Sequence, residues 1–123
     1  RGLFGGGQLT GPNAMSDVID YVNISSRVSI FSSNDDYSGE FMTNPMVSER
    51  FTQVTKLPVT LEKHSIVGCG CVILPGVILN EGAAVGALSL IKRSVPEYTI
   101  VAGNPAVIVK ERKRNLINIE RLL

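Results

Sequence analysis

The chain has 123 residues, of which 44% are hydrophobic and 19% are charged, with twelve glycines and six prolines. This composition is typical of one turn-rich globular domain over residues 1–123, and it excludes a disordered chain. A formal net charge of +1 gives no field that would attract nucleic acid, and no apolar run is long enough to span a membrane, so we expect neither partner.

Aliphatic residues recur every six positions along most of the chain. The two series are Val18, Ile24 and Ile30, and then Leu61, Val67, Ile73, Leu79, Val85 and Ile91. An α-helix repeats near 3.6 residues and a β-strand at 2, so neither gives a step of six by itself. The chain must therefore turn between one aliphatic residue and the next.

The residues between the aliphatic positions indicate what kind of turn this is. Gly70, Gly76 and Gly82 each stand three positions after an aliphatic residue, where glycine suits a tight turn with positive φ. Small or branched residues stand four positions after, namely Cys71, Val77, Ala83, Ser89 and Val95. Each hexad is then a short strand and a turn, and three hexads make one triangular coil of a parallel β-helix. We expect Val67 to lie over Val85, and Ile73 over Ile91. An antiparallel sandwich would show turns every 8–12 residues instead.

The hexads stop after Ile30 and resume at Leu61, which predicts a loop excursion over residues 31–60. A loop of this length inside a compact domain is usually functional. It contains Asn34, Asp35, Asp36 and Tyr37. Two interpretations are open: the loop covers one face of its own prism, or it forms a wall that reaches a neighbouring subunit.

The last part of the chain changes character. Pro105 is followed by basic residues and then by Leu116, Ile119 and Leu123 at helical spacing, so residues 106–123 are predicted to form a short C-terminal helix.

The two cysteines, Cys69 and Cys71, lie inside the repeat and are expected to be small filling residues. A metal site would need more Cys or His nearby, so none is expected, and the scarcity of Cys suits a reducing cytoplasm.

The stretch VGCGCVILPGVILNEGAAVGALSLIKRSVPEYTIVAGNPAVIVKER resembles the hexapeptide-repeat acyltransferases, and ISSRVSIFSSNDDYSGEFMTNP is similar to the bacterial surface-polysaccharide sugar O- and N-acetyltransferases. The resemblance runs from about Asp17 to Arg114, and V-A-G-N-P is its most specific part. It implies an all-β fold, a left-handed parallel β-helix, and a homotrimer with active sites between subunits. The implied activity is transfer of an acetyl group from acetyl-coenzyme A to a hydroxyl or amine of a sugar, a surface-polysaccharide precursor.

Acetyl transfer needs a base for the proton of the acceptor and a surface that holds the cofactor beside it. The resemblance puts a catalytic His just before the long loop, where this chain has Asp35. His64, the single histidine of the chain, follows the loop in a Lys-His pair that polysaccharide-type relatives share. His64 is therefore expected to be the base, with Asp35 orienting it, and Asn34, Asp36 and Tyr37 are expected at the acceptor. The alternative is that His64 is an exposed turn residue.

The resemblance also implies a coenzyme A site. Its expected residues are Cys69, Gly86 and Ala87 along the pantetheine groove, Lys92 and Arg93 after the last coil, and Asn104, Pro105 and Lys110 in the closing segment. Val107 stands where relatives often have Lys or Arg, which removes one cationic contact. Two other functions are open: an antibiotic or xenobiotic acetyltransferase, and a non-catalytic β-helix that serves as an assembly module.

Overall fold

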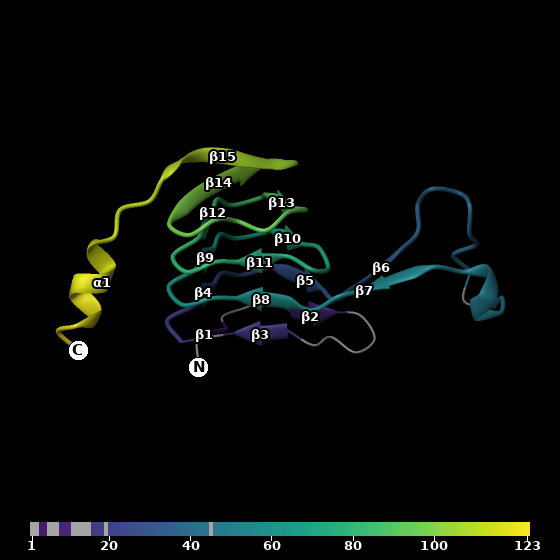
Figure 1. Ribbon diagram of the computed structural model, residues 1–123, viewed down its shortest axis with the longest axis horizontal. Helices are drawn as coiled ribbons and strands as arrows, with labels where there is room; N and C mark the ends of the chain where they lie inside the picture. Colours follow the sequence, from purple (N-terminus) through teal and green to yellow (C-terminus); the bar gives the residue numbers. More distant parts are fainter. Residues whose placement is uncertain (1–2, 5–7, 11–15, 19, 45) are drawn as a thin grey trace.

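The computed structural model describes residues 3–4, 8–10, 16–18, 20–44 and 46–123 (Figure 1). Most of the regular structure consists of strands of two or three residues, which is the length that one hexad leaves after its turn. The strands are β1 (Leu3–Phe4), β2 (Gln8–Thr10), β3 (Ser16–Val18), β4 (Asn23–Ile24), β5 (Ser29–Phe31), β6 (Ser33–Asp35), β7 (Val54–Lys56), β8 (Val59–Leu61), β9 (Ile66–Val67), β10 (Val72–Ile73), β11 (Ile78–Leu79), β12 (Ala84–Val85), β13 (Leu90–Ile91), β14 (Thr99–Gly103) and β15 (Ala106–Glu111). The helices are the single-turn η1 (Glu49–Phe51) and α1 (Asn115–Glu120).

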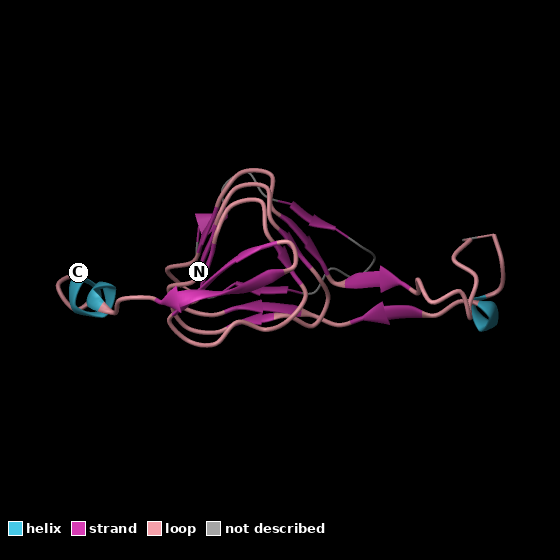
Figure 2. Cartoon of the chain, turned by 90° about the horizontal axis from the view of Figure 1, so that it is seen from above, coloured by secondary structure: helices cyan, strands magenta, loops and turns pink. Residues whose placement is uncertain are grey.

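Three sheets form the three faces of a triangular prism (Figure 2). Face A holds β1, β4, β9, β12 and β14 in parallel, with β15 antiparallel at its end; face B holds β2, β5, β10 and β13; face C holds β3, β8 and β11. Because β9, β10 and β11 lie in faces A, B and C in turn and β12 returns to face A, the chain advances by one coil every three hexads. This confirms the predicted winding. We name the corners by the faces that they join: AB, BC and CA.

The inward side chains stack from coil to coil as the six-residue step predicts. Val67 pairs with Val85, Ile73 with Ile91, and Leu61 with Leu79. The members of the two series from Ile24 onward are all buried, and so are Cys71, Val77, Ala83, Ser89 and Val95. Val18 pairs through its backbone with Leu61, and its side chain lies outside the described residues. Burial of one aliphatic side chain contributes roughly 1.5–3 kcal/mol, so this column is the main stabilising element of the prism.

Most corner turns contain one residue with positive φ, three positions after the inward aliphatic residue. Gly70, Gly76 and Gly82 have φ values of 74°, 82° and 72°, as predicted. At the same position other turns have a residue with a side chain, namely Tyr21, Arg27, His64 and Leu88, with φ between 60° and 63°. Each such residue costs about 1–2 kcal/mol relative to an ordinary backbone conformation. The stacking of the coils imposes this backbone even where the sequence lacks glycine.

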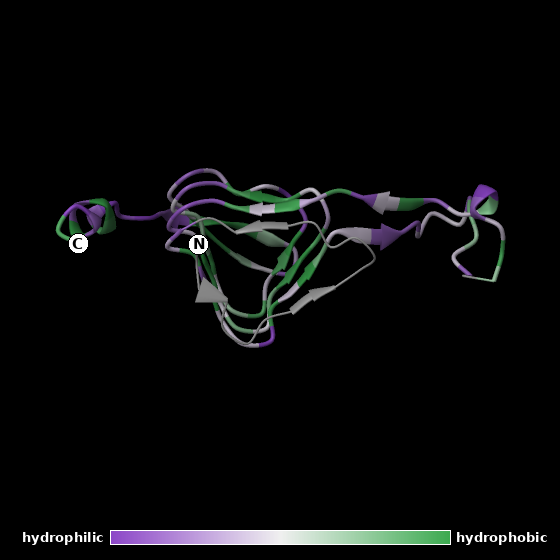
Figure 3. Ribbon diagram, turned by 90° about the horizontal axis from the view of Figure 1, so that it is seen from below, coloured by the Kyte–Doolittle hydropathy of each residue, from purple (hydrophilic) through white to green (hydrophobic). Residues whose placement is uncertain are grey.

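The excursion predicted over residues 31–60 is an arm that projects from corner BC (Figures 1 and 2). It leaves after β5 and returns at β8, and β6 pairs antiparallel with β7 along its stem. At its base the Leu57 N–H donates to the Ser32 carbonyl, with an N···O distance of 2.9 Å. The arm extends away from the prism, so the interpretation as a cover over a face of its own prism is wrong. Figure 3 shows hydrophobic and hydrophilic segments alternating along it.

The C-terminal helix is shorter than the 106–123 range predicted. Residues 106–111 form β15, which pairs antiparallel with β14, and α1 covers only Asn115–Glu120. The run Ala106-Val-Ile-Val is β-branched, which favours a strand, and the edge of β14 offers it backbone hydrogen-bond partners. The helical spacing begins only at Leu116.

Two glycine substitutions separate the backbone requirement of a corner from its packing. A Cβ on Gly82 would contact the buried ring of Tyr98, whereas a Cβ on Gly70 would contact only the end of the exposed Leu88 side chain. Both glycines have positive φ, so either alanine costs about 1–2 kcal/mol in unfolding free energy. Gly82→Ala should cost about 1–3 kcal/mol more, because Tyr98 is held in place. Denaturant unfolding of both variants measures the difference, and equal losses would contradict it.

Candidate active site

The site residues predicted from the sequence lie in three regions of the structure. The acceptor candidates Asn34, Asp36 and Tyr37 lie on the arm with Asp35. The cofactor candidates lie at corner AB and at the C-terminal end of the prism. His64 lies at corner CA. Face C separates corner CA from corner BC, where the arm begins, so within one chain the structure does not bring His64 and Asp35 together.

The polar residues of the arm are largely exposed. The Tyr37 hydroxyl donates to Asn34 Oδ1 at 3.2 Å, and the Ser38 hydroxyl donates to Asp36 Oδ2 at 2.7 Å. Asp35 ends β6, and its exposed carboxylate makes no hydrogen bond or ion pair with the described residues. The arm therefore presents carboxylate, amide and phenol groups to its surroundings. A second surface would have to face them to enclose a ligand.

A pocket of 570 Å³ opens at the C-terminal end of the prism, between the last coil and the β14–β15 hairpin. Its walls are mostly apolar, with Lys92 and Arg93 on one side and Pro105 on the other. Three of the predicted cofactor residues therefore line one pocket. An apolar cavity with cations at its edge suits a ligand that joins an apolar portion to phosphate groups.

Corner AB presents small residues on successive coils. The Leu88 N–H donates to the Cys69 carbonyl at 2.8 Å, which stacks the turn containing Gly86 and Ala87 on the turn containing Cys69. The Gly103 N–H donates to the Ser89 hydroxyl at 3.0 Å, so Asn104 and Pro105 continue the same corner. The structure thus joins five predicted cofactor residues in one line that reaches the pocket. Lys110 lies apart from them, near the other end of β15, where it pairs with Ile100.

The two cysteines differ in environment, because the turn at Gly70 separates them. Cys69 is exposed, whereas Cys71 is buried and its thiol donates to the Gly86 carbonyl at 3.0 Å. Burial raises the pKa of the Cys71 thiol above its ordinary value. Cys71 therefore acts as a filling residue, as predicted, while Cys69 is available at the corner AB surface.

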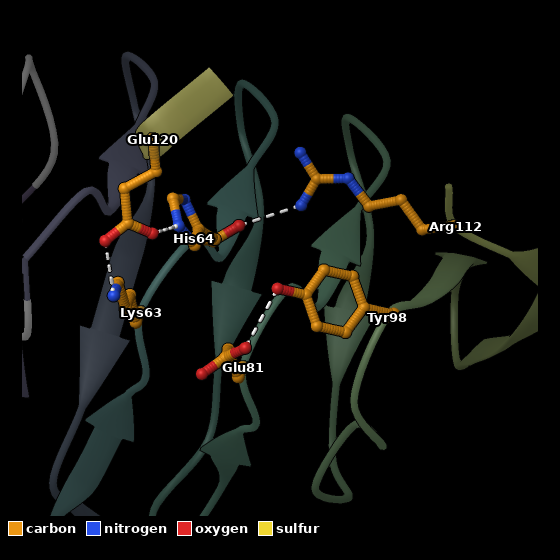
Figure 4. A network of polar contacts seen from close by, with 6 residues as sticks. All are labelled: Lys63, His64, Glu81, Tyr98, Arg112 and Glu120. Carbon is orange, nitrogen blue, oxygen red and sulfur yellow. Dashed lines mark hydrogen bonds and ion pairs between the residues drawn. The ribbon is translucent and has the colours of Figure 1, made fainter. Parts of the chain in front are cut away.

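His64 belongs to a polar network at corner CA (Figure 4). Its Nε2 lies 2.5 Å from Glu120 Oε1, and Lys63 Nζ lies 2.6 Å from Glu120 Oε2. The imidazole stacks on the Tyr21 ring, with centroids 5.2 Å apart and planes at 16°. The side chain is 9% exposed. His64 is therefore a paired and nearly buried residue, not the exposed turn residue of the alternative interpretation.

Glu120 was not singled out by any sequence pattern, although it determines the environment of His64. The hydrogen bond from Lys63, followed by the one with His64, lowers the pKa of the Glu120 carboxyl, and the same carboxylate raises the pKa of Lys63. The two oxygens of the carboxylate are thus shared by two partners. Glu120 is 56 residues from His64 in sequence, and no local sequence pattern links the two residues.

Tyr98 anchors the same corner. Its ring is fully buried, its hydroxyl donates to Glu81 Oε2 at 2.9 Å, and the guanidinium of Arg114 lies 4.3 Å from the ring centroid. Burial, with the hydrogen bond to Glu81, raises the pKa of Tyr98 to about 12.

Among the described residues, no helix is long and apolar enough to cross a membrane. In the same part of the chain, no three His, Cys, Asp or Glu residues are grouped so that they could hold a metal ion.

The raised pKa of Tyr98 predicts a pH dependence of stability. The folded pKa lies above the ordinary value of 10, so the contribution is complete below pH 10 and is lost as the pH rises to about 12. Between these limits the unfolding free energy of the wild type should fall more steeply with pH than that of Tyr98→Phe, which has no hydroxyl at this position. Urea unfolding between pH 9 and roughly 11 tests this, and parallel curves for the two proteins would refute it.

Known proteins resemble this chain in sequence and in structure. The dTDP-4-amino-4,6-dideoxy-D-glucose acyltransferase of Escherichia coli is 48% identical over 103 residues, which are 84% of the chain and 54% of that enzyme. AntD, an N-acyltransferase from Bacillus cereus solved with dTDP and 3-hydroxybutyryl-CoA, matches with a TM-score of 0.88 at 34% identity, over 94% of the chain and 62% of AntD. A variant of AntD was solved with dTDP-4-amino-4,6-dideoxyglucose and coenzyme A.

A more distant match concerns the fold alone. A hexapeptide-repeat-containing acetyltransferase from Vibrio cholerae has a TM-score of 0.63 at 23% identity, over 77% of the chain and 50% of that protein. No protein-family model matches the chain. The chain spans between half and two thirds of the length of the relatives described here.

Proposed function

Because the chain belongs to the hexapeptide-repeat acyltransferases, we propose that it transfers an acyl group from acyl-coenzyme A to the amine of a dTDP-linked amino sugar. The observation that carries the proposal is the 48% identity, over 84% of the chain, to an acyltransferase for such a sugar. The acetyl group predicted from the sequence is one acyl group of this class. The sugar is proposed to serve as a surface-polysaccharide precursor, and the coil to be left-handed, as the sequence resemblance implies.

The chemistry requires one proton to move. The amine nitrogen attacks the carbonyl carbon of the thioester, a C–N bond forms, and the C–S bond breaks to release coenzyme A. A base takes the surplus proton of the amine and passes it to the departing thiolate. Between the two catalytic candidates, the geometry favours Asp35 as this base, because its carboxylate is exposed and makes no hydrogen bond or ion pair with the described residues, whereas Nε2 of His64 is already bonded to Glu120. Asn34, Asp36 and Tyr37 would then bind the acceptor.

We propose that the active site lies between the subunits of a homotrimer. A two-stranded ribbon is only marginally stable in water, and the exposed fractions of the arm residues Tyr37, Met42 and Met46 are 84%, 53% and 88%. A neighbouring prism packed against the arm would cover these side chains and supply the second surface that Asp35 lacks. Cyclic three-fold packing would use the same pair of surfaces three times. A monomer mass in light scattering would contradict this arrangement.

The cofactor is proposed to follow corner AB into the end pocket. The small residues Cys69, Gly86 and Ala87 would allow the pantetheine to lie close to the backbone, and Asn104 and Pro105 would close the groove. Lys92 and Arg93 would meet the phosphates, whereas Lys110, which lies apart from this line, is not part of the proposed site. Two free thiols suit a reducing compartment, so we propose that the reaction takes place in the cytoplasm.

If the acceptor is an amino sugar, the rate of thiol release should differ sharply between two sugar nucleotides. Thiol release from acetyl-CoA or 3-hydroxybutyryl-CoA should be rapid with dTDP-4-amino-4,6-dideoxyglucose. It should be at background with dTDP-glucose, which offers hydroxyls but no amine. Mass spectrometry of the product checks that an amide has formed.

The alternatives give other results in the same assay. Acylation of an antibiotic such as chloramphenicol, with no turnover of the amino sugar, would favour the xenobiotic enzyme. A folded protein that shows no thermal shift with coenzyme A would favour the non-catalytic assembly module.

Two substitutions separate the candidates for the base. Asp35→Asn should lower kcat by roughly 10²–10⁴-fold, because the amide cannot accept the proton. Glu40→Gln removes another exposed carboxylate of the arm and should leave kcat unchanged. If His64→Ala lost as much in kcat while Asp35→Asn lost little, the original assignment of His64 as the base would stand instead.

A further inference from the structure

The three corners of the prism differ in what covers them (Figure 2). Residues 112–120 run beside corner CA, where Arg112 donates to the carbonyls of His64 and Gly82. The last of these residues, Glu120, is bonded to His64. Corner BC carries the arm of the same chain. Corner AB is the apex that faces away from both segments, so it is the corner that is left free for a neighbour.

The residues with positive φ at corner CA lie against other parts of the same chain. The Tyr21 ring stacks on the His64 imidazole, and the Tyr98 ring is buried. At corner AB the residues that combine positive φ with a side chain are Arg27 and Leu88, with φ values of 60° and 61°. This backbone conformation costs stability for any residue with a Cβ. A side chain that is kept there and remains exposed therefore indicates a function outside the fold of the single chain.

Leu88 projects from the line of small residues at corner AB. Its side chain lies toward the preceding coil, where a Cβ on Gly70 would be 2.6 Å from Leu88 Cδ2. The residue nevertheless remains 76% exposed. Glycine forms the same turn one coil earlier, with a φ of 74° at Gly70, so the turn alone does not account for a leucine at this position.

Corner AB and the arm have opposite charge. Arg27 is the one charged residue in the three stacked turns of this corner, residues 25–28, 68–71 and 86–89. It is exposed and makes no hydrogen bond or ion pair with the described residues. The arm has a formal net charge of −2, from Asp35, Asp36, Glu40 and Glu49 against Arg50 and Lys56. Because the arm also exposes Tyr37, Met42 and Met46, the two surfaces complement each other in charge and in apolar character.

We propose that corner AB is the receptor for the arm of a neighbouring copy of this chain, with Leu88 as its apolar anchor and Arg27 facing the acidic arm. The inference rests on the proposed function and names the surface that completes its site. Within one chain the arm leaves corner BC and extends away from the prism, so Asp35 does not lie beside corner AB. The arm of a neighbour would bring Asp35 to the groove proposed for the thioester, and would close that groove from outside.

Substitutions at Leu88 test the anchor, since aspartate and glycine both tolerate a left-handed backbone. Leu88→Asp places a negative charge against the acidic arm. The concentration at which the trimer dissociates should therefore rise, and kcat should fall, each by roughly tenfold or more. Leu88→Gly should show smaller losses in the same direction, although glycine relieves the strain in the turn itself. Sedimentation equilibrium and turnover assays measure both effects.

Two further variants serve as comparisons. Val109→Asp adds the same charge at an exposed aliphatic residue of β15, on face A, and should change neither the assembly nor kcat. Arg27→Gln should weaken the assembly less than Leu88→Asp, and should make it less sensitive to added salt.

Mixed trimers test whether the arm acts across the subunit boundary. Asp35→Asn keeps corner AB intact but lacks the base, whereas Leu88→Asp keeps the base but lacks the anchor. The two variants are produced together with different tags and purified through both tags. In such a trimer, a site built from the arm of one variant and corner AB of the other has both wild-type residues. A cyclic trimer that contains both chains has one such site, so it should regain about one third of the wild-type kcat.

Each outcome decides a separate point. Wild-type assembly and kcat in Leu88→Asp would overturn the anchor. Mixed trimers that are no more active than the two variants alone would overturn the delivery of Asp35 by a neighbour. Weaker binding of coenzyme A by Leu88→Asp, with assembly and kcat unchanged, would assign Leu88 to the cofactor instead. If the wild-type chain had no acyltransferase activity, the proposed function would fail, whereas the dependence of the assembly on Leu88 would still decide whether corner AB is the interface.

Discussion

The stacking of each inward aliphatic side chain on its equivalent in the next coil sets the position of every other part of the molecule. Val67 under Val85 and Ile73 under Ile91 fix the register of faces A and B, and the corners follow from that register. The corners then impose a positive φ even on His64, which carries a side chain. The inward positions are filled by the core, and the candidate site residues lie at the corners, on the arm and at the end of the prism.

The sequence predicts most of the prism, because its signals are local. The step of six and the glycines at Gly70, Gly76 and Gly82 report contacts and turns that repeat along the chain. The arm could be located from the interruption of the step, but its direction depends on how β6 and β7 pair. β15 was mistaken for helix because its pairing with the edge of β14 is a tertiary effect that outweighs the spacing seen in the last residues.

The candidate site could be predicted only in part, for the same physical reason. Resemblance identified the small residues of corner AB, which the structure joins into one line with the closing hairpin. The partner of His64 could not be found, because the helical spacing of residues 116–123 does not indicate where Glu120 packs. The separation of His64 from Asp35 likewise follows from which corner each hexad occupies. A motif assigns a role to a residue by its position in the sequence, but it does not report the contacts that the side chain makes in the folded chain.

The segment after β15, residues 112–120, also changes how the stack of coils can come apart. In a solenoid each repeat contacts only its neighbours, so the end repeat can normally fray by itself. Here Arg112 is bonded to the His64 and Gly82 turns, and Glu120 is bonded to the His64 turn, which lies two coils before Tyr98. The terminal coil therefore cannot peel away without releasing its hold on the interior coils. The coils near the closing hairpin should therefore unfold together, as a globular domain does, although the prism is built as a one-dimensional array.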